Sequence, residues 1–141
     1  SVETVVARRG LVVRLLTDNV LFDSGLADLK AAGMPLLTQI GTLLAVEARH
    51  PILVEGHTDD VPISTARFAS NWELSTARAS QVVRYLIGRN VPARRFGAAG
   101  YADLHPLSTN GTDGGRARNR RVEVVLQRLH ELPATAKGIA P

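Results

Sequence analysis

The sequence predicts an α/β (α+β) domain in which helices pack on a single sheet. Short β-branched apolar runs alternate along the chain with segments whose apolar residues recur at helical spacing. The chain has 141 residues, which is the size of one domain rather than two. One hydrophobic core is therefore expected to organise the whole chain.

The first half of the chain predicts two strands with a helix between them. Leu11 to Leu16 is a short β-branched run that ends at turn-forming residues, and it predicts a strand. Ala31 to Ala48 has apolar residues on one helical face, and Pro51 follows it as a helix breaker. Ile52 to Val54 predicts the second strand. The polar stretch from His57 to Ser70 predicts a long surface loop.

The second half predicts a further helix and two more strands. Ser75 is the expected N-cap of a regular helical stripe that ends near Gly88. Arg95 to Gly100 predicts a weaker strand, and Asp103 to Gly115 is rich in turn residues. A short helical turn is expected next, and Arg121 to Leu126 predicts the last strand.

The ends of the chain differ in composition from its middle. We expect residues 1–9 to be an N-terminal linker remnant, residues 10–128 to be the domain, and residues 129–141 to be a flexible C-terminal tail. No apolar run reaches the ~18 residues that a membrane span needs. Because the sequence starts at Ser1 without a methionine, we expect that a longer parent chain was trimmed, which leaves room for an upstream membrane anchor.

Composition excludes several classes of function. The chain has no cysteine, so it has no disulfide, no thiolate nucleophile and no zinc ribbon. Its net charge of +4 is a mild excess and aromatics make up only 4% of residues, which argues against nucleic-acid binding. No GxSxG, P-loop or HExxH pattern is present. We therefore expect no enzyme activity, no catalytic residues and no cofactor.

The acidic segment from Glu55 to Asp60 follows a predicted strand and leads into the long loop, where ligand sites concentrate in such folds. His57, Asp59 and Asp60 offer metal ligands, but no distant histidine pair completes the set. A solvated turn explains the same residues, and we expect no metal site.

Arg78 lies three residues after the expected N-cap, in the first turn of the helix. The helix dipole disfavours a cation there by roughly 0.3–1 kcal/mol, so a negative group is expected nearby. Asp59 and Arg78 together could grip the ammonium and the carboxylate of a zwitterion. An internal Asp59–Arg78 ion pair satisfies the same physics, and both alternatives stay open at this point.

Three groups of residues resemble the motifs of the OmpA-like family of peptidoglycan-binding domains. They are Gly56, Thr58 and Asp59; Asn71, Leu74, Ser75, Arg78 and Ala79; and Asn119, Arg120, Arg121, Val122 and Glu123. The resemblance covers roughly residues 10 to 128. It implies a β-α-β-α-β-(α)-β sandwich with a single mixed sheet and helices packed on it.

The resemblance also implies a ligand, namely the diaminopimelate-containing stem peptide of peptidoglycan and its adjoining sugar. The family's recognition pair corresponds to Asp59 and Arg78 here, with orienting hydrogen bonds from Thr58, Asn71 and Arg121. The full set of expected site residues is Asp59, Arg78, Thr58, Asn71, Arg121, Gly56, His57 and Asn119.

Within the family, the chain is most similar to the MotB-type flagellar stator subfamily. This likeness depends on Asp60, on Pro62-Ile63 in a lengthened loop, and on the stretch from Ser70 to Ser75. It implies a non-catalytic periplasmic cell-wall anchor of an ion-driven motor, needed for motility and chemotaxis. The parent would be held in the inner membrane by a segment absent from this chain, beside a MotA-like partner and as a homodimer.

Two other functions remain open. An OmpA-like cell-wall anchor of a secretion system or an outer-membrane lipoprotein would carry the same motifs. A cell-wall enzyme that uses His57 and Asp59 has only the proximity of these two residues in its favour.

Overall fold

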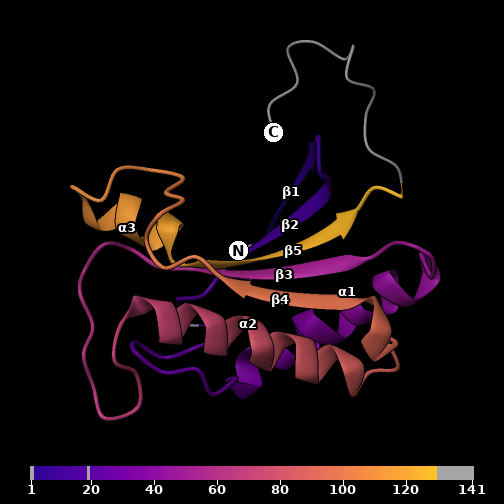
Figure 1. Cartoon of the computed structure of the whole chain (residues 1–141), viewed down its shortest axis with the longest axis horizontal. Coiled ribbons are helices and arrows are strands. Elements are labelled where there is room, and N and C mark those ends of the chain that lie inside the picture. The colour runs from indigo at the N-terminus through magenta and orange to yellow at the C-terminus, as the bar shows by residue number, and fades with distance from the viewer. Residues whose placement is uncertain (1, 19, 130–141) are drawn as a thin grey trace.

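Five strands form one mixed sheet in the computed structural model, which describes residues 2–18 and 20–129 (Figure 1). The strands are β1 (Val2–Ala7), β2 (Gly10–Leu16), β3 (Ile52–His57), β4 (Phe96–Gly100) and β5 (Arg121–Gln127), in the spatial order β1-β2-β5-β3-β4. β3 and β4 run parallel, and the other neighbours run antiparallel. The predicted α+β fold with a single mixed sheet is confirmed.

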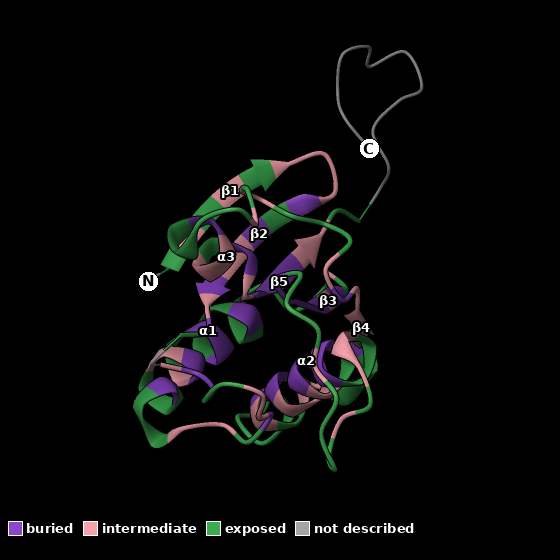
Figure 2. Cartoon of the chain, turned by 90° about the vertical axis from the view of Figure 1, so that its left-hand side faces the viewer, coloured by how far each residue is buried: buried purple, intermediate pink, exposed green. Residues whose placement is uncertain are grey.

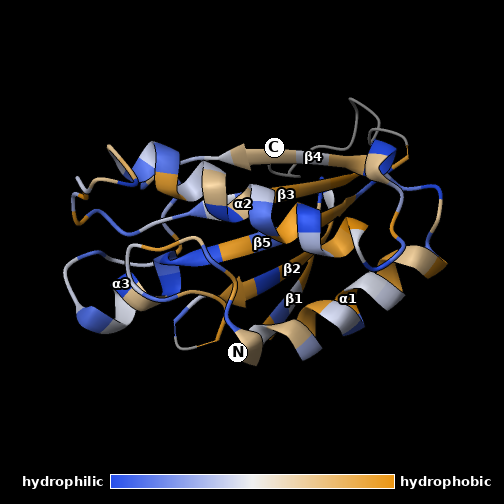
Figure 3. Cartoon of the chain, turned by 90° about the horizontal axis from the view of Figure 1, so that it is seen from below, coloured by the Kyte–Doolittle hydropathy of each residue, from blue (hydrophilic) through white to orange (hydrophobic). Residues whose placement is uncertain are grey.

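Two long helices, α1 (Met34–Val46) and α2 (Asn71–Ile87), pack on the same face of the sheet (Figures 1 and 3). Short 3-10 helices, η1 (Ala31–Gly33) and η2 (Ala93–Arg95), precede α1 and β4, and α3 (Asp113–Asn119) leads into β5. Among the described residues, no helix combines the length and the apolar character needed to cross a bilayer.

The hydrophobic core lies between the sheet and these two helices. Side chains alternate between the faces of a strand, so the register partners Val13, Val124 and Val54 point to one face together. Helix α1 contributes Leu37, Ile40 and Leu44 to this core, and α2 contributes Ala79, Val82 and Leu86. Figure 2 shows the resulting buried positions along β2, β5 and β3 and on one side of α2.

The first residues of the chain form a strand and not the expected linker. Residues 2–7 do not form a linker, because β1 pairs with β2 over its whole length, from Val2 opposite Leu15 to Ala7 opposite Gly10. The hairpin turn consists of Arg8 and Arg9 and lacks the Asn-Gly or Asp-Gly dipeptide that usually indicates such a turn. The sequence therefore does not predict that β1 pairs with β2. The expected tail, apart from Leu129, lies outside the described residues.

The start of α2 also differs from expectation. Its N-cap is Ser70, whose hydroxyl oxygen accepts a hydrogen bond from the Trp72 N–H at 3.1 Å, and not Ser75. Arg78 therefore lies two turns into the helix rather than in its first turn. The helix-dipole argument for a negative neighbour of Arg78 does not apply, and any such neighbour must have another cause.

A buried guanidinium closes the end of α1. Arg95 donates to three carbonyl oxygens there: Nη1 to Leu44 at 2.6 Å, Nη2 to Glu47 at 2.5 Å and Nε to His50 at 3.0 Å. The last carbonyl groups of a helix have no hydrogen-bond donors within the helix, and Arg95 provides donors to them.

We expect Arg95→Ala to lower the free energy of unfolding by about 2–4 kcal/mol, because three carbonyl oxygens, of which that of Leu44 is buried, lose a charged donor. Arg94→Ala is the matched control, since Arg94 is the exposed neighbour in η2. Urea unfolding of both variants tests this, and equal midpoints would refute the capping role of Arg95.

Candidate functional site

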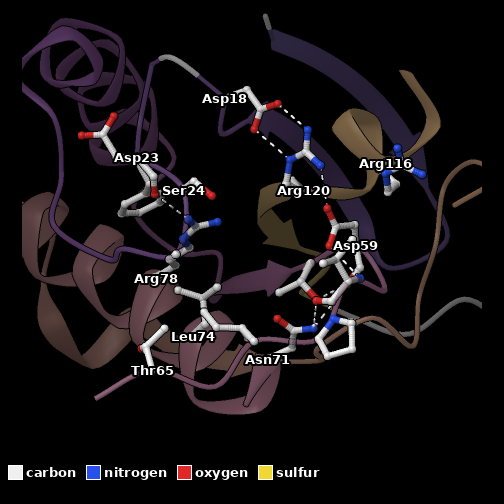
Figure 4. Close-up of a pocket in the computed structure, with 16 residues that line it drawn as sticks. Asp18, Asp23, Ser24, Asp59, Thr65, Asn71, Leu74, Arg78, Arg116 and Arg120 are labelled. Carbon is white, nitrogen blue, oxygen red and sulfur yellow. Dashed lines mark hydrogen bonds and ion pairs between the residues drawn. The ribbon is translucent and has the colours of Figure 1, made fainter. Parts of the chain in front are cut away.

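A polar pocket of about 710 Å³ lies at one end of the sheet. It is built where β2 and β3 end, where α2 begins, and where α3 leads into β5. The charged residues that line it are Asp18, Asp23, Asp59, Arg78, Arg116 and Arg120. Figure 4 shows Arg78 and Asp59 on opposite sides of this pocket.

Arg78 reaches the pocket from α2 and is only 5% exposed. Its Nε donates to the Leu26 carbonyl at 2.8 Å and its Nη2 to the Asp23 carbonyl at 3.0 Å. Its guanidinium carbon lies 4.9 Å from the centre of the Phe22 ring. No described residue accepts a hydrogen bond from Nη1, so the guanidinium is fixed in place with donor capacity left for an anion.

Burial lowers the pKa of Arg78 to about 10, even though the nearby carboxylate of Asp18 raises it. Arg78 therefore stays charged at neutral pH, yet none of its hydrogen bonds goes to a carboxylate. A bound carboxylate would relieve this desolvation of the charge.

Asp59 forms the opposite wall, and its ion-pair partner is Arg120 rather than Arg78. Arg120 Nη1 lies 2.6 Å from Asp59 Oδ2, and the Val61 N–H donates to Asp59 Oδ1 at 3.0 Å. The remaining nitrogens of Arg120 fork onto the Asp18 carboxylate, Nε at 2.9 Å and Nη2 at 2.6 Å. The internal Asp59–Arg78 pair left open by the sequence is therefore not formed.

Thr58 and Asn71, also expected at the site, hold the loop that shapes the pocket. The Thr58 hydroxyl donates to the Asp59 carbonyl at 2.7 Å. The Asn71 side-chain amide donates to the Val61 carbonyl at 3.0 Å. Both residues line the pocket, and their hydrogen bonds fix the loop that follows β3.

The other four expected site residues lie outside the pocket. Gly56 contacts the backbone of α2, and Asn119 is buried, where its side-chain oxygen accepts from the N–H groups of Leu107 and Ser108. His57 and Arg121 are buried on the sheet face away from α1 and α2. All four support the scaffold around the pocket.

That second face of the sheet carries a buried ionic network. Glu123 accepts from Arg9, Arg14 and Arg121, at 2.8, 2.9 and 2.9 Å. Glu55 lies beside it in register and accepts from Arg9 at 2.5 Å and from His57 Nε2 at 3.1 Å. The two carboxylates are therefore shared among three guanidinium groups.

This network shifts the pKa values of its acids. Burial raises the pKa of Glu55, but the hydrogen bonds from His57 and Arg9 outweigh it and lower the pKa to about 2. Burial lowers the pKa of His57 below 6.5, so His57 is neutral at neutral pH and donates through Nε2. Its Nδ1 is buried without a partner among the described residues.

Glu55, His57 and Glu123 bring potential metal ligands within 4.8 Å of one another. The two carboxylates already form ion pairs with Arg9, Arg14 and Arg121, which leaves little negative charge to attract a cation. The set expected from the sequence, His57 with Asp59 and Asp60, is not brought together. His57 hydrogen-bonds to Glu55, whereas Asp59 lines the pocket. With their present partners, neither set is arranged to bind a metal ion.

The sequence analysis did not select four of the charged residues that line the pocket, namely Asp18, Asp23, Arg116 and Arg120. Arg120 and Asp18 matter most, because they pair with each other and with Asp59. Arg120 belongs to the Asn-Arg-Arg-Val-Glu motif, but its neighbour Arg121 was selected from that motif instead. Adjacent residues at a strand start point in opposite directions, so only one of the two can face the pocket. Asp18 sits in a turn sequence that any solvated loop would share.

Comparison with known proteins identifies the family of this chain. The model of the OmpA family matches residues 21–120. Motility protein B of Bacillus subtilis is 38% identical over 127 residues, which cover 89% of this chain and 48% of that protein. The chain thus spans about half the length of this relative, and the same holds for two others that it matches.

Two solved structures share both fold and sequence with the chain. The cell wall anchor of the T6SS from Pseudomonas aeruginosa is 41% identical, with a TM-score of 0.82 over 90% of this chain and 88% of that one. A MotB-like protein from Desulfovibrio vulgaris is 36% identical, with a TM-score of 0.84 over 90% and 81%. Since the family model matches residues 21–120, which include both long helices and every pocket residue except Asp18, the chain belongs to the OmpA family.

Proposed function

We propose that this domain binds peptidoglycan without catalysis, through the pocket between Asp59 and Arg78. The observation that carries the proposal is the pocket itself, in which a fixed, buried guanidinium with a free Nη1 faces an acidic wall. Such a pair of walls complements a group that carries both a carboxylate and an ammonium. The diaminopimelate of the stem peptide is such a group.

The proposed machine is a MotB-type flagellar stator, which the domain would anchor to the cell wall from the periplasm. The likeness to Motility protein B and to a MotB-like structure supports this assignment. In this function the parent chain is held in the inner membrane beside a MotA-like subunit and acts as a homodimer.

A second candidate is the cell-wall anchor of a secretion system. The likeness to the T6SS anchor of Pseudomonas aeruginosa favours it. The two sequences are 41% identical, and the alignment covers 88% of the anchor structure. Both candidates use the same pocket and the same ligand. Copurification of the full parent chain with a MotA-like membrane subunit would support the stator, and copurification with secretion-system components would support the alternative.

The binding itself is tested by co-sedimentation with isolated peptidoglycan sacculi at near-physiological salt. We expect the wild type to pellet, and Arg78→Gln and Asp59→Asn each to bind at least tenfold more weakly, because each removes a charged partner of the ligand. Arg84→Gln is the matched control, since Arg84 is exposed on the same helix.

Thermal melting of each variant separates loss of binding from loss of fold. If folded Arg78→Gln pelleted as well as the wild type, the assignment of the pocket would be wrong. If the wild type did not pellet, the proposed function would fail as a whole.

A further inference from the structure

The acidic wall of the pocket is a chain of three charged groups. Asp18 holds Arg120 through two parallel contacts, at 2.9 and 2.6 Å, and Arg120 holds Asp59 through a third, at 2.6 Å. Asp18 and Arg120 form a two-pronged ion pair, which fixes the direction of the guanidinium. Figure 4 shows Arg120 between the two carboxylates.

The charge of this wall depends on Asp18. Arg120 and Asp59 alone would neutralise each other and leave nothing to attract an ammonium group. Asp18 adds a second carboxylate against the one guanidinium, so the three groups together carry one excess negative charge. The other charged residues of the pocket do not change this balance, because Asp23 pairs with Lys30 and Arg116 pairs with Asp113.

The opposite wall carries one positive charge, on Arg78. Of the carboxylates that act on Arg78, Asp18 has the strongest effect on its pKa. The charge of Asp18 is therefore felt across the pocket and is not confined to its pair with Arg120. With Asp18 the pocket is balanced, with one negative and one positive wall, whereas without Asp18 it would be a cationic pocket.

We propose that Asp18 is a specificity-determining residue of the pocket, which makes it select ligands with an ammonium group over ligands that carry only carboxylates. The inference rests on the proposed function, because it concerns the same pocket. Asp18 acts through charge and through its hold on Arg120, and its side chain is 41% exposed, so its replacement is compatible with folding.

The test compares two small probes of the same length, meso-diaminopimelate and pimelate, which differ in the amino groups. Their dissociation constants are measured by calorimetry or NMR titration for the wild type, Asp18→Asn and Asp28→Asn. Asp28→Asn is the matched control, because Asp28 also pairs with an arginine, Arg67, but its side chain is 66% exposed and does not line the pocket.

We expect the wild type to prefer diaminopimelate. Asp18→Asn should reduce that preference about tenfold, as expected for the loss of one partly exposed unit charge in the pocket lining. Weaker diaminopimelate binding together with unchanged or stronger pimelate binding would support the inference. Asp28→Asn should leave the preference unchanged.

Two outcomes would overturn the inference, and they are distinguishable from failure of the proposed function. Asp18→Asn could weaken both probes equally, which would make Asp18 a purely structural residue. It could also leave both affinities unchanged. In either case wild-type binding to sacculi would stand, whereas a wild type that bound neither sacculi nor diaminopimelate would overturn both proposals.

Discussion

Replacing Gly56 by alanine is expected to lower the free energy of unfolding by about 3 kcal/mol or more. A Cβ atom at Gly56 would lie 2.1 Å from the Ser75 carbonyl oxygen and 2.8 Å from its carbonyl carbon. Both atoms belong to the backbone of α2, so no side-chain rotation can relieve the overlap. Gly100, the register partner of Gly56 in β4, meets the same turn of α2.

This close approach links stability to the pocket, because α2 carries Arg78 and Asn71. A displaced α2 would move the guanidinium away from the acidic wall. We therefore expect any folded Gly56→Ala protein to bind sacculi more weakly as well, although Gly56 does not line the pocket.

Gly114→Ala is the matched control for this substitution. A Cβ at Gly114 has no neighbour within 4 Å, and the residue lies in the first turn of α3. Alanine should be neutral there or stabilise the domain by roughly 0.5–1 kcal/mol, since glycine is the weaker helix former. Urea unfolding of the two variants checks this, and equal stabilities would show that the packing of β3 against α2 is not the constraint.

The central strands and both long helices could be predicted from the sequence because their residues follow simple periods. Val122, Val124 and Val125 indicate a strand by themselves, and the stripe from Ala79 to Ile87 indicates a helix. The sequence pattern places the start of α2 too late, because its first turn has only one buried apolar residue, Leu74, and so lacks a helical stripe. Ser70 and Glu73 have the S-x-x-E spacing of a capping box, and this spacing marks the true start.

The candidate site was only half predictable, and the reason is geometric. Asp59 and Arg78 could be selected by charge and motif, and the structure places both at the pocket. Whether Arg120 or Arg121 faces that pocket depends on strand register, which a single sequence does not specify. The contact of Arg120 with Asp18 joins residues 102 positions apart, and no local pattern indicates such a pair.

The ionic network on the second face of the sheet gives the other large expected effect. We expect Glu55→Gln to be less stable than the wild type at pH 7 by on the order of 3 kcal/mol. The pKa of Glu55 is lowered from 4.5 to about 2, and each pKa unit corresponds to about 1.4 kcal/mol. The neutral amide also leaves Arg9, whose side chain is 37% exposed, with a poorer partner.

The sign of the pH dependence follows from the same shift. A carboxyl group with a lowered pKa in the folded state stabilises the fold fully above its unfolded value, near 4.5, and loses this contribution as the pH falls through about 2. The stability difference between wild type and Glu55→Gln should therefore be constant above about pH 5 and should shrink toward zero near pH 2. Urea unfolding at several pH values measures that difference, in which the contributions of carboxylates outside the network cancel.

Glu47→Gln serves as the control for this prediction, because the Glu47 side chain is 57% exposed and its partner, His50, lies 3.9 Å away. An exposed pair contributes little, so this variant should match the wild type at every pH. If the Glu55→Gln difference did not change between pH 5 and pH 2, the charge of Glu55 would not be the source of its effect. The network would then stabilise the sheet through packing and hydrogen bonds that are independent of ionisation.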